Sequence, residues 1–442
     1  MKDLIQIADN SQRTFEPQQL EHLRPLAGVP IKNIRLDGYP NLLIFPHSLS
    51  DCPDKIQDSS IFTIQGEDTL VSGNIMGFVG IGDTRLRIYS RFAKEDEQDF
   101  FLHYMLQRVF AINLFDLQYN SNRTDIFDFL IYLFPTYLKR AYRQGLYKEY
   151  QTHHFNDPHI RGRIDFAQHI PHNIPYNGNI AYQTREYAYN NDLTQLIRHT
   201  IEYIRQHPYA GGILLNDTDT KDAIKAIEQA TPTYNRQERA RIINRNLRPN
   251  QHPYYNEYRY LQQLCLQILR HEELKYGSMD NEIYGILFDG AWLWEEYLAT
   301  VLTDYHHSRN KENKGAIYLF DNPKSAPRYP DFYKPDFILD AKYKGYADKR
   351  VSEVDRDDLH QLITYMFIER ATCGGLVYPY PSLSGAQDFS SESIAQSSLR
   401  GYGGIISLFG LHIPQLAPSW SAFQTAMHQS EQYLLSLLSN SH

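Results

Sequence analysis

The segment Arg328-Tyr-Pro-Asp-Phe-Tyr-Lys-Pro-Asp-Phe-Ile-Leu-Asp-Ala-Lys-Tyr-Lys344 decides the fold expected for the C-terminal part of this 442-residue chain. Residues 337–343 are predicted to form a strand, because they begin with three consecutive apolar, β-prone residues. Asp340 and Lys342 are two residues apart, so they project from the same face of that strand. An acid and a lysine together on a core strand conflict with burial, and such conflicts cluster at functional sites.

A second carboxylate comes from one of two Pro-Asp pairs that precede Asp340. Asp336 lies four residues away on the same strand, roughly 13 Å at about 3.3 Å per residue, which is too far to share one metal ion. If the segment folds as a hairpin with Pro335 and Asp336 at its tip, Asp331 lies opposite Asp340, with Cβ atoms about 5 Å apart. We therefore expect Asp331, Asp340 and Lys342 to converge on one patch. Asp336 is expected to be a turn residue and stays open as the alternative ligand.

The residue types in this patch indicate phosphodiester hydrolysis with a divalent cation. Two carboxylates and the backbone carbonyl of Ala341 make an oxygen-rich site of the kind that Mg²⁺ prefers. The metal would polarise the scissile phosphate and help to generate hydroxide from bound water. Lys342 would orient or deprotonate that water and stabilise charge on the phosphate. The competing interpretation is a hairpin with an ordinary surface salt bridge, since acid-x-Lys triplets also occur by chance.

Two predicted helices on either side of the segment offer further side chains. The upstream helix carries Glu295 and Glu296, of which only one can point at the site, because neighbours on a helix diverge by about 100°. On the downstream helix, Gln361 and Tyr365 share one face. They are expected to contact the site or the DNA backbone, and packing at the edge of the core is the alternative.

Local patterns along the chain predict an α+β multidomain protein. Residues 1–95 contain short strand-like runs broken by Gly, Pro and Asp, which predicts a β-rich region. Residues 96–278 are predicted to be a mainly helical middle region, in which 151–190 are rich in loops. In 279–442 we expect elements in the order α-β-β-β-α-β, with residues 316–320 as the first of the three consecutive strands.

Composition limits the classes of partner and compartment. A net charge of −8 argues against general coating of nucleic acid, but not against a local basic groove. Residues 235–260, which include Arg245 and Arg248 among interleaved tyrosines, are the best candidate for phosphate contact; pairing with nearby acids is the equally weighted alternative. No signal-peptide layout, long apolar run or CxxC motif is present, so we expect a cytoplasmic protein with reduced cysteines and no membrane span.

These motifs together resemble a known nuclease group. Pro330-Asp331 and Asp340-Ala-Lys342, in the order α-β-β-β-α-β, resemble the PD-(D/E)xK nuclease superfamily. Within it, the chain is similar to the McrC family, the nuclease subunit of McrBC-type modification-dependent restriction systems. The resemblance extends to Gly80-Ile-Gly-Asp-Thr-Arg-Leu-Arg-Ile88, Arg161-Gly-Arg-Ile164, Leu293-Trp-Glu-Glu-Tyr297 and Asp358-Leu-His-Gln-Leu362 with Tyr365.

The resemblance implies a Mg²⁺-dependent endonuclease subunit that cuts double-stranded DNA in a restriction system of the 5-methylcytosine type. The family pattern of an apolar pair followed by Glu favours Glu295 over Glu296, whereas the very short hairpin departs from the pattern. The full expectation is a catalytic set of Asp331, Asp340, Lys342, Glu295 and Gln361, a metal held by Asp331, Asp340 and Ala341, and DNA contacts from Tyr365, Lys344, Arg245 and Arg248.

The resemblance also implies a partner, a McrB-like, GTP-hydrolysing AAA+ hexamer that the chain stimulates and contacts through its N-terminal region. The chain has no GxxxxGK[ST] loop, so we expect it to bind no nucleotide itself. Two alternatives stay open: a non-catalytic adaptor that only stimulates the AAA+ ring, and a stand-alone DNA repair nuclease. Intact Asp331, Asp340 and Lys342 favour a catalytic role over the adaptor.

Overall fold

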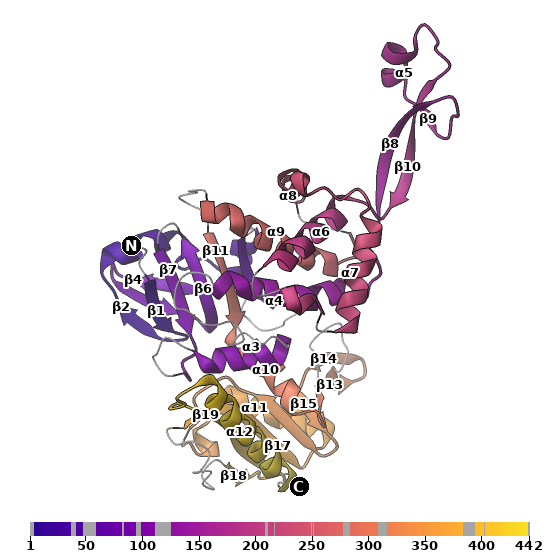
Figure 1. Cartoon of the computed structure of the whole chain (residues 1–442). Coiled ribbons are helices and arrows are strands. Elements are labelled where there is room, and N and C mark those ends of the chain that lie inside the picture. The colour runs from indigo at the N-terminus through magenta and orange to yellow at the C-terminus, as the bar shows by residue number, and fades with distance from the viewer. Residues whose placement is uncertain are drawn as a thin grey trace. The chain divides into compact units, whose positions relative to one another are not determined.

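In the computed structural model the chain forms two compact units, one made of residues 1–115 and 279–442 and the other of residues 116–278 (Figure 1). The second unit ends at residue 278, and both segments that flank it along the chain belong to the first unit. The structure describes all residues except 1–3, 37–40, 47–58, 82–83, 94–98, 111–124, 208–210, 216, 249, 251, 277–282, 308–315, 348, 383–393, 402 and 441–442.

The N-terminal part of the first unit is built on a five-stranded sheet. Its strands are, in spatial order, β1 (Leu4–Ala8), β7 (Thr84–Tyr89), β6 (Ile75–Ile81), β11 (Ile283–Asp289) and β3 (Asn41–Phe45). A three-stranded sheet of β2 (Gln12–Thr14), β5 (Thr69–Ser72) and β4 (Phe62–Gln65) and the helices α1 (Pro17–Leu20) and α2 (Ile31–Leu36) complete this part. Alternate residues of β7 are buried, as expected for a strand with one face on a core.

One strand of this sheet, β11, follows the second unit along the chain. β11 pairs antiparallel with β6 and parallel with β3, although about 200 residues separate it from them along the chain. Gly285 of β11 lies against the backbone of Phe78, where a Cβ would approach the carbonyl oxygen to 2.4 Å. The same strand leads directly into α10 (Gly290–Val301), so the N-terminal sheet and the C-terminal part are continuous.

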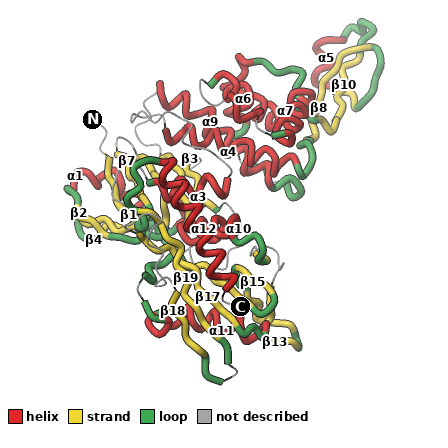
Figure 2. Tube along the Cα trace, turned by 60° about the horizontal axis from the view of Figure 1, so that its bottom comes forward, coloured by secondary structure: helices red, strands yellow, loops and turns green. Residues whose placement is uncertain are grey.

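The C-terminal part contains a six-stranded sheet. Its order is β12 (His306–His307), β15 (Phe332–Lys334), β16 (Phe337–Ala341), β17 (Cys373–Ser382), β19 (Ile405–Pro414) and β18 (Ile394–Ser398). β16, β17 and β19 run parallel, and α11 (Arg356–Glu369) forms the crossover between β16 and β17 and packs on both. α12 (Trp420–Asn440) packs along β19 (Figure 2).

The prediction that residues 316–320 supply the first strand of this sheet is wrong. They form β13 (Ile317–Asp321), which among the strands that the structure describes pairs with β14 (Lys324–Arg328) alone, in a separate two-stranded sheet. The position beside β15 is taken instead by the two-residue strand β12, which precedes β13 in the chain. Because an isolated apolar run gives no information about its pairing partner, the sequence identified a strand and assigned it to the wrong sheet.

The second unit combines helices with a long β-hairpin. Its helices are α4 (Asp125–Tyr142), α6 (Asp192–Gln206), α7 (Thr218–Ala230), α8 (Arg239–Arg245) and α9 (Glu257–Tyr276). The predicted loop-rich stretch 151–190 is instead ordered as β8 (Glu149–Asp157), β9 (Arg163–Ile164), α5 (Phe166–Asn173) and β10 (Ile180–Ala188). β8 and β10 extend from the helices with α5 at their far end (Figure 1). The residues of β8 are mostly exposed and lack the apolar–polar alternation that predicts a strand.

In the second unit, helices α4 and α6 both pack against α9. The start of α6 is fixed by Asn191, whose side chain accepts a hydrogen bond from the Thr194 backbone N–H while the Thr194 hydroxyl accepts one from the Asn191 N–H. No helix in the described parts of the chain is both long enough and apolar enough to cross a membrane.

Candidate active site

The Pro-Asp segment folds as the predicted hairpin. β15 and β16 pair antiparallel with Phe332 opposite Leu339 and Lys334 opposite Phe337, the register expected from a turn at Pro335-Asp336. Asp336 has φ 65°, in the left-handed region that Asn and Asp tolerate in turns. Its carboxylate accepts hydrogen bonds of 2.5 Å from the backbone N–H and the hydroxyl of Thr372. The prediction that Asp336 is a turn residue is therefore confirmed.

Asp340 and Lys342 meet on the face of β16 that is covered by α11. Asp340 is fully buried, and its Oδ2 lies 2.6 Å from Lys342 Nζ. Lys342 Nζ also donates a hydrogen bond of 3.0 Å to Gln361 Oε1 on α11. Burial by itself lowers the pKa of Lys342, but the carboxylates of Asp340, Asp331 and Asp358 outweigh it and raise the pKa above that of a free lysine. Lys342 is thus a protonated donor at neutral pH.

Asp331 lies beside Asp340 at the start of β15. Its Oδ2 accepts a hydrogen bond of 2.7 Å from the Ala341 N–H, the residue that follows Asp340. Burial raises the pKa of Asp331 well above its usual range, and the charges of Asp340 and Glu295 raise it further; Lys342 and the Ala341 N–H oppose this shift. Asp331 rather than Asp336 thus shares an environment with Asp340.

Glu295 reaches this environment from α10, as its effect on the pKa of Asp331 indicates. Its Oε1 lies 3.7 Å from Nε2 of His307 on the edge strand β12, and His307 Nδ1 is 3.0 Å from the Asp331 carbonyl oxygen. Sequence reasoning missed His307. The only signal was its position shortly after the Glu295 helix, because the pairing of β12 with β15 that brings it here is a tertiary contact.

On α11, Gln361 and Tyr365 share one face, as predicted. Gln361 Nε2 donates a hydrogen bond of 2.7 Å to the Tyr365 hydroxyl while its Oε1 accepts from Lys342. Tyr365 is only 3 % exposed, and burial together with the Asp340 charge raises the pKa of its phenol. The Tyr365 hydroxyl thus helps to fix the Gln361 side chain, which in turn accepts from Lys342. The contact of Tyr365 with DNA stays a prediction that its burial does not favour.

The other residues predicted to contact DNA are Lys344, Arg245 and Arg248. Lys344 Nζ bonds the carboxylates of Asp355 and Asp358, at 2.9 and 2.6 Å, so its charge is already compensated. Arg245 and Arg248 belong to the second unit; both are exposed, and Arg245 Nη1 lies 3.2 Å from Asp192 Oδ1. The pairing of Arg245 with a nearby acid is the alternative that the sequence left open. DNA contact by these residues stays a prediction.

The carboxylate oxygens of the site are ligands of the kind that suits a hard divalent cation. Within the described residues, no group of three or more His, Cys, Asp or Glu side chains has a geometry that could hold a metal ion. Mg²⁺, however, is commonly held by one or two carboxylates and keeps several waters. Asp340 Oδ1 is buried and accepts no hydrogen bond from any described residue, the type of atom that a cation would satisfy. Asp331 and Asp340 are therefore suitable ligands for Mg²⁺ completed by water and substrate.

Replacement of Asp331 by Asn should stabilise the metal-free protein. The raised pKa means that ionised Asp331 costs folding free energy at neutral pH, whereas Asn is neutral and its Oδ1 still accepts from Ala341. We expect a gain of about 1 kcal/mol in urea unfolding at pH 7.5 with chelator. The difference should vanish below about pH 4, where Asp331 is protonated in both states, and should grow as pH rises.

The same unfolding measurement with saturating Mg²⁺ tests whether Asp331 binds the cation. The cation should raise the free energy of unfolding of the wild type and leave that of Asp331→Asn nearly unchanged, because a ligand stabilises only the state that binds it. An Asp331→Asn variant that is less stable than the wild type at every pH, or that gains as much from Mg²⁺, would contradict the placement of Asp331.

The chain matches one family model and is similar in fold to solved structures. Residues 70–379 match the model of a family described as "McrBC 5-methylcytosine restriction system component". Over 98 % of its length the chain is similar to all of one chain in the structure titled "Refined half-complex from tetradecameric assembly of Thermococcus gammatolerans McrB AAA+ hexamers with bound McrC", with 17 % identity and a TM-score of 0.50. At this identity the similarity concerns the fold.

A second solved structure, the cryo-EM structure of the Thermococcus gammatolerans McrBC complex, is also similar at 17 % identity. The match covers 68 % of this chain and 87 % of that chain, with a TM-score of 0.33. No curated protein matches the chain in sequence.

Proposed function

The chain belongs to the family of McrBC 5-methylcytosine restriction system components, and from this premise we propose that it is the nuclease subunit of such a system. In this proposal, the C-terminal part is a PD-(D/E)xK core that cuts double-stranded DNA with Mg²⁺. The observation that carries the proposal is the convergence of Asp331, Asp340 and Lys342 at one end of the β15–β16 hairpin. The fully buried Asp340 beside a second acid is costly for stability, which favours a functional reason for keeping it.

Each residue of the site has a distinct role in this proposal. Asp331 and Asp340 would hold a cation, which when bound supplies Lewis-acid polarisation of the phosphate. Lys342, whose Nζ lies 2.6 Å from Asp340 Oδ2 and donates to Gln361, acts as a donor: it orients water and stabilises negative charge on the phosphate oxygens. Gln361 fixes Lys342 Nζ, and Glu295 adds a third acidic group that orients water near Asp331.

The same proposal includes a partner, a McrB-like AAA+ hexamer that hydrolyses GTP and is stimulated by this chain. It is supported by the family match and by the fold similarity, over 98 % of the chain, to a chain in a structure of Thermococcus gammatolerans McrB AAA+ hexamers with bound McrC. The absence of a GxxxxGK[ST] loop from the sequence agrees with nucleotide binding by the partner alone.

The test is cleavage of methylated and unmethylated plasmid by the purified chain with Mg²⁺, with and without a McrB-like AAA+ protein from the same source and GTP. We expect cutting of methylated DNA that requires the partner and is lost in Asp340→Asn. Cutting without the partner would replace the proposal by a stand-alone nuclease. Stimulation of GTP hydrolysis with no cutting, equal in wild type and variant, would identify an adaptor.

A further inference from the structure

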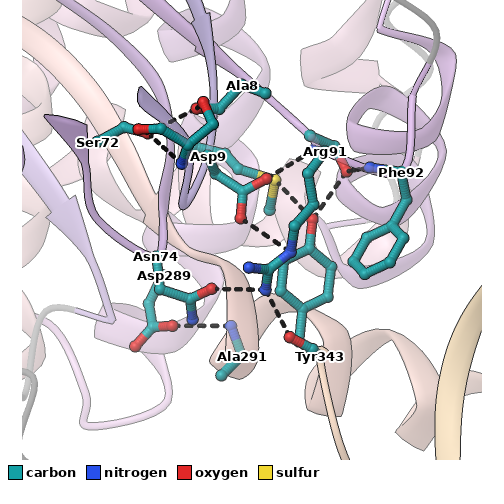
Figure 3. Close-up of polar contacts among 12 residues, drawn as sticks. Ala8, Asp9, Ser72, Asn74, Arg91, Phe92, Asp289, Ala291 and Tyr343 are labelled. Carbon is teal, nitrogen blue, oxygen red and sulfur yellow. Dashed lines mark hydrogen bonds and ion pairs between the residues drawn. The ribbon is translucent and has the colours of Figure 1, made fainter. Parts of the chain in front are cut away.

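Arg91 lies where the N-terminal sheet meets the polypeptide that leaves β16 (Figure 3). It follows β7, and its backbone N–H donates a hydrogen bond of 2.6 Å to Oδ1 of Asp9, a buried residue that follows β1. Its Nε lies 3.6 Å from Asp9 Oδ2. Burial raises the pKa of Asp9 to about 6, opposed by Arg91, so Asp9 is mainly ionised at neutral pH and pairs with the guanidinium. Arg91 is thus anchored in the N-terminal sheet by main chain and side chain.

The other end of the guanidinium binds the backbone next to the candidate active site. Nη2 of Arg91 donates a hydrogen bond of 2.6 Å to the carbonyl oxygen of Tyr343 and one of 3.1 Å to Asn74 Oδ1 (Figure 3). Tyr343 directly follows Lys342, whose N–H donates to the Val377 carbonyl of β17 at 2.8 Å. β16 ends at Ala341. The Lys342–Tyr343 backbone beyond that end is therefore held by two hydrogen bonds, one from Arg91 to the Tyr343 carbonyl and one from the Lys342 N–H to Val377.

The Tyr343 side chain strengthens the same attachment. The guanidinium carbon of Arg91 lies 4.8 Å from the centre of the Tyr343 ring, within the range of a cation–π contact. The buried Tyr343 hydroxyl lies 2.7 Å from Ser90 Oγ and 3.3 Å from Met76 Sδ. Tyr343 is thereby held by β6, through Met76, and by Ser90 and Arg91, which follow β7.

The same contacts reach the helix that carries Glu295. Asn74 binds Arg91 through its side chain and accepts a hydrogen bond of 3.0 Å from the N–H of Gly290, the first residue of α10, through its carbonyl. Gly290 lies so close to Tyr343 that a Cβ would come within 2.8 Å of the ring. Two of the segments that carry site residues are therefore connected to Arg91: residues 342–343 directly, and the start of α10 through Asn74.

We propose that Arg91 is a positioning residue of the candidate active site: by binding the Tyr343 carbonyl it fixes the backbone from which Lys342 reaches Asp340 and Gln361. The inference rests on the proposed nuclease function for its effect on cleavage. Lys342 Nζ must hold a narrow position to act as a donor, and misplacement of a catalytic group by about 1 Å costs roughly 10²-fold in rate. Arg91 itself contacts none of the groups that would react.

The test compares Arg91→Gln with a matched variant, Arg108→Gln, in the complex with partner, Mg²⁺ and methylated plasmid. Arg108 belongs to α3 (Phe100–Phe110) of the same unit, lies 3.6 Å from Glu431 and donates to a backbone carbonyl, that of Thr300, but does not contact Tyr343. We expect kcat to fall about 10²-fold in Arg91→Gln with KM for DNA nearly unchanged, and little change in Arg108→Gln. Equal losses in both would indicate general destabilisation and overturn the inference.

Hydrogen–deuterium exchange of residues 341–346 tests the inference without cleavage. Exchange should be faster in Arg91→Gln than in the wild type and unchanged in Arg108→Gln. Equal exchange in Arg91→Gln and wild type would overturn the positioning role, whether or not the wild type cuts DNA. Faster exchange in Arg91→Gln, combined with a wild type that never cuts DNA, would reject the proposed function and leave the positioning role intact. If Arg91→Gln does not fold, Arg91→Lys, which keeps the charge but not the planar fork, undergoes the same comparison.

Discussion

Asp340→Asn is expected to reduce the single-turnover rate of DNA cleavage by at least about 10³-fold, because the substitution removes one of two carboxylates available to a cation worth several kcal/mol of transition-state stabilisation. Asp340 is fully buried, ion-paired to Lys342, and beside Asp331. The measurement is cleavage of methylated plasmid in the assembled complex with saturating Mg²⁺ and GTP. Stimulation of the partner's GTP hydrolysis should persist, since no step of that reaction involves Asp340.

Asp336→Asn is the matched control for this prediction. It removes the carboxylate of the other Pro-Asp pair, at the hairpin tip, where Asn tolerates the positive φ and still accepts from the Thr372 N–H. We expect cleavage to stay within about threefold of the wild type, as is usual for a site outside the chemistry. Loss of cleavage in Asp336→Asn with retention in Asp340→Asn would reverse the assignment of the ligands.

Lys342→Met is expected to lower kcat by about 10² to 10³-fold, the usual cost of removing one donor that stabilises transition-state charge. Methionine keeps an unbranched apolar side chain and removes the ammonium that lies 2.6 Å from Asp340. The metal-free variant should also be destabilised by roughly 3 kcal/mol, because buried carboxylates lose their compensating cation. Urea unfolding with chelator measures this loss, and Mg²⁺ should partly reverse it.

Lys344→Met separates this effect from a general loss of positive charge. Lys344 lies two residues further along and pairs with Asp355 and Asp358, and Lys344→Met should change kcat by no more than a few-fold. Because the pKa of Lys342 is raised, wild-type cleavage should show no loss between pH 7 and pH 9 that depends on Lys342. Equal defects in both lysine variants, or such a loss, would contradict the role of Lys342 as a protonated donor.

The hairpin and the side chains it aligns follow from local sequence. A turn at Pro335-Asp336 predicted the register that the hairpin adopts, and that register places Asp331 beside Asp340. The i, i+4 spacing of Gln361 and Tyr365 correctly predicted a shared helical face. The centre of the candidate site was therefore predictable, because its residues are close in sequence or lie on regular elements.

Tertiary structure decided which elements meet. The apolar run of β13 predicts a strand, but its partner is chosen by packing that no local pattern records, so β13 pairs with β14 outside the six-stranded sheet. The pairing of β11 with strands of the N-terminal sheet is likewise a tertiary contact. For the same reason the sequence alone could not assign His307 to the site or Arg91 to the backbone of Tyr343. By itself the sequence determined, through local periodicity and turn residues, which side chains meet at the centre of the candidate site. The fold determined how those side chains are held in place, because contacts between residues far apart in the chain depend on the shapes of surfaces that exist only after folding.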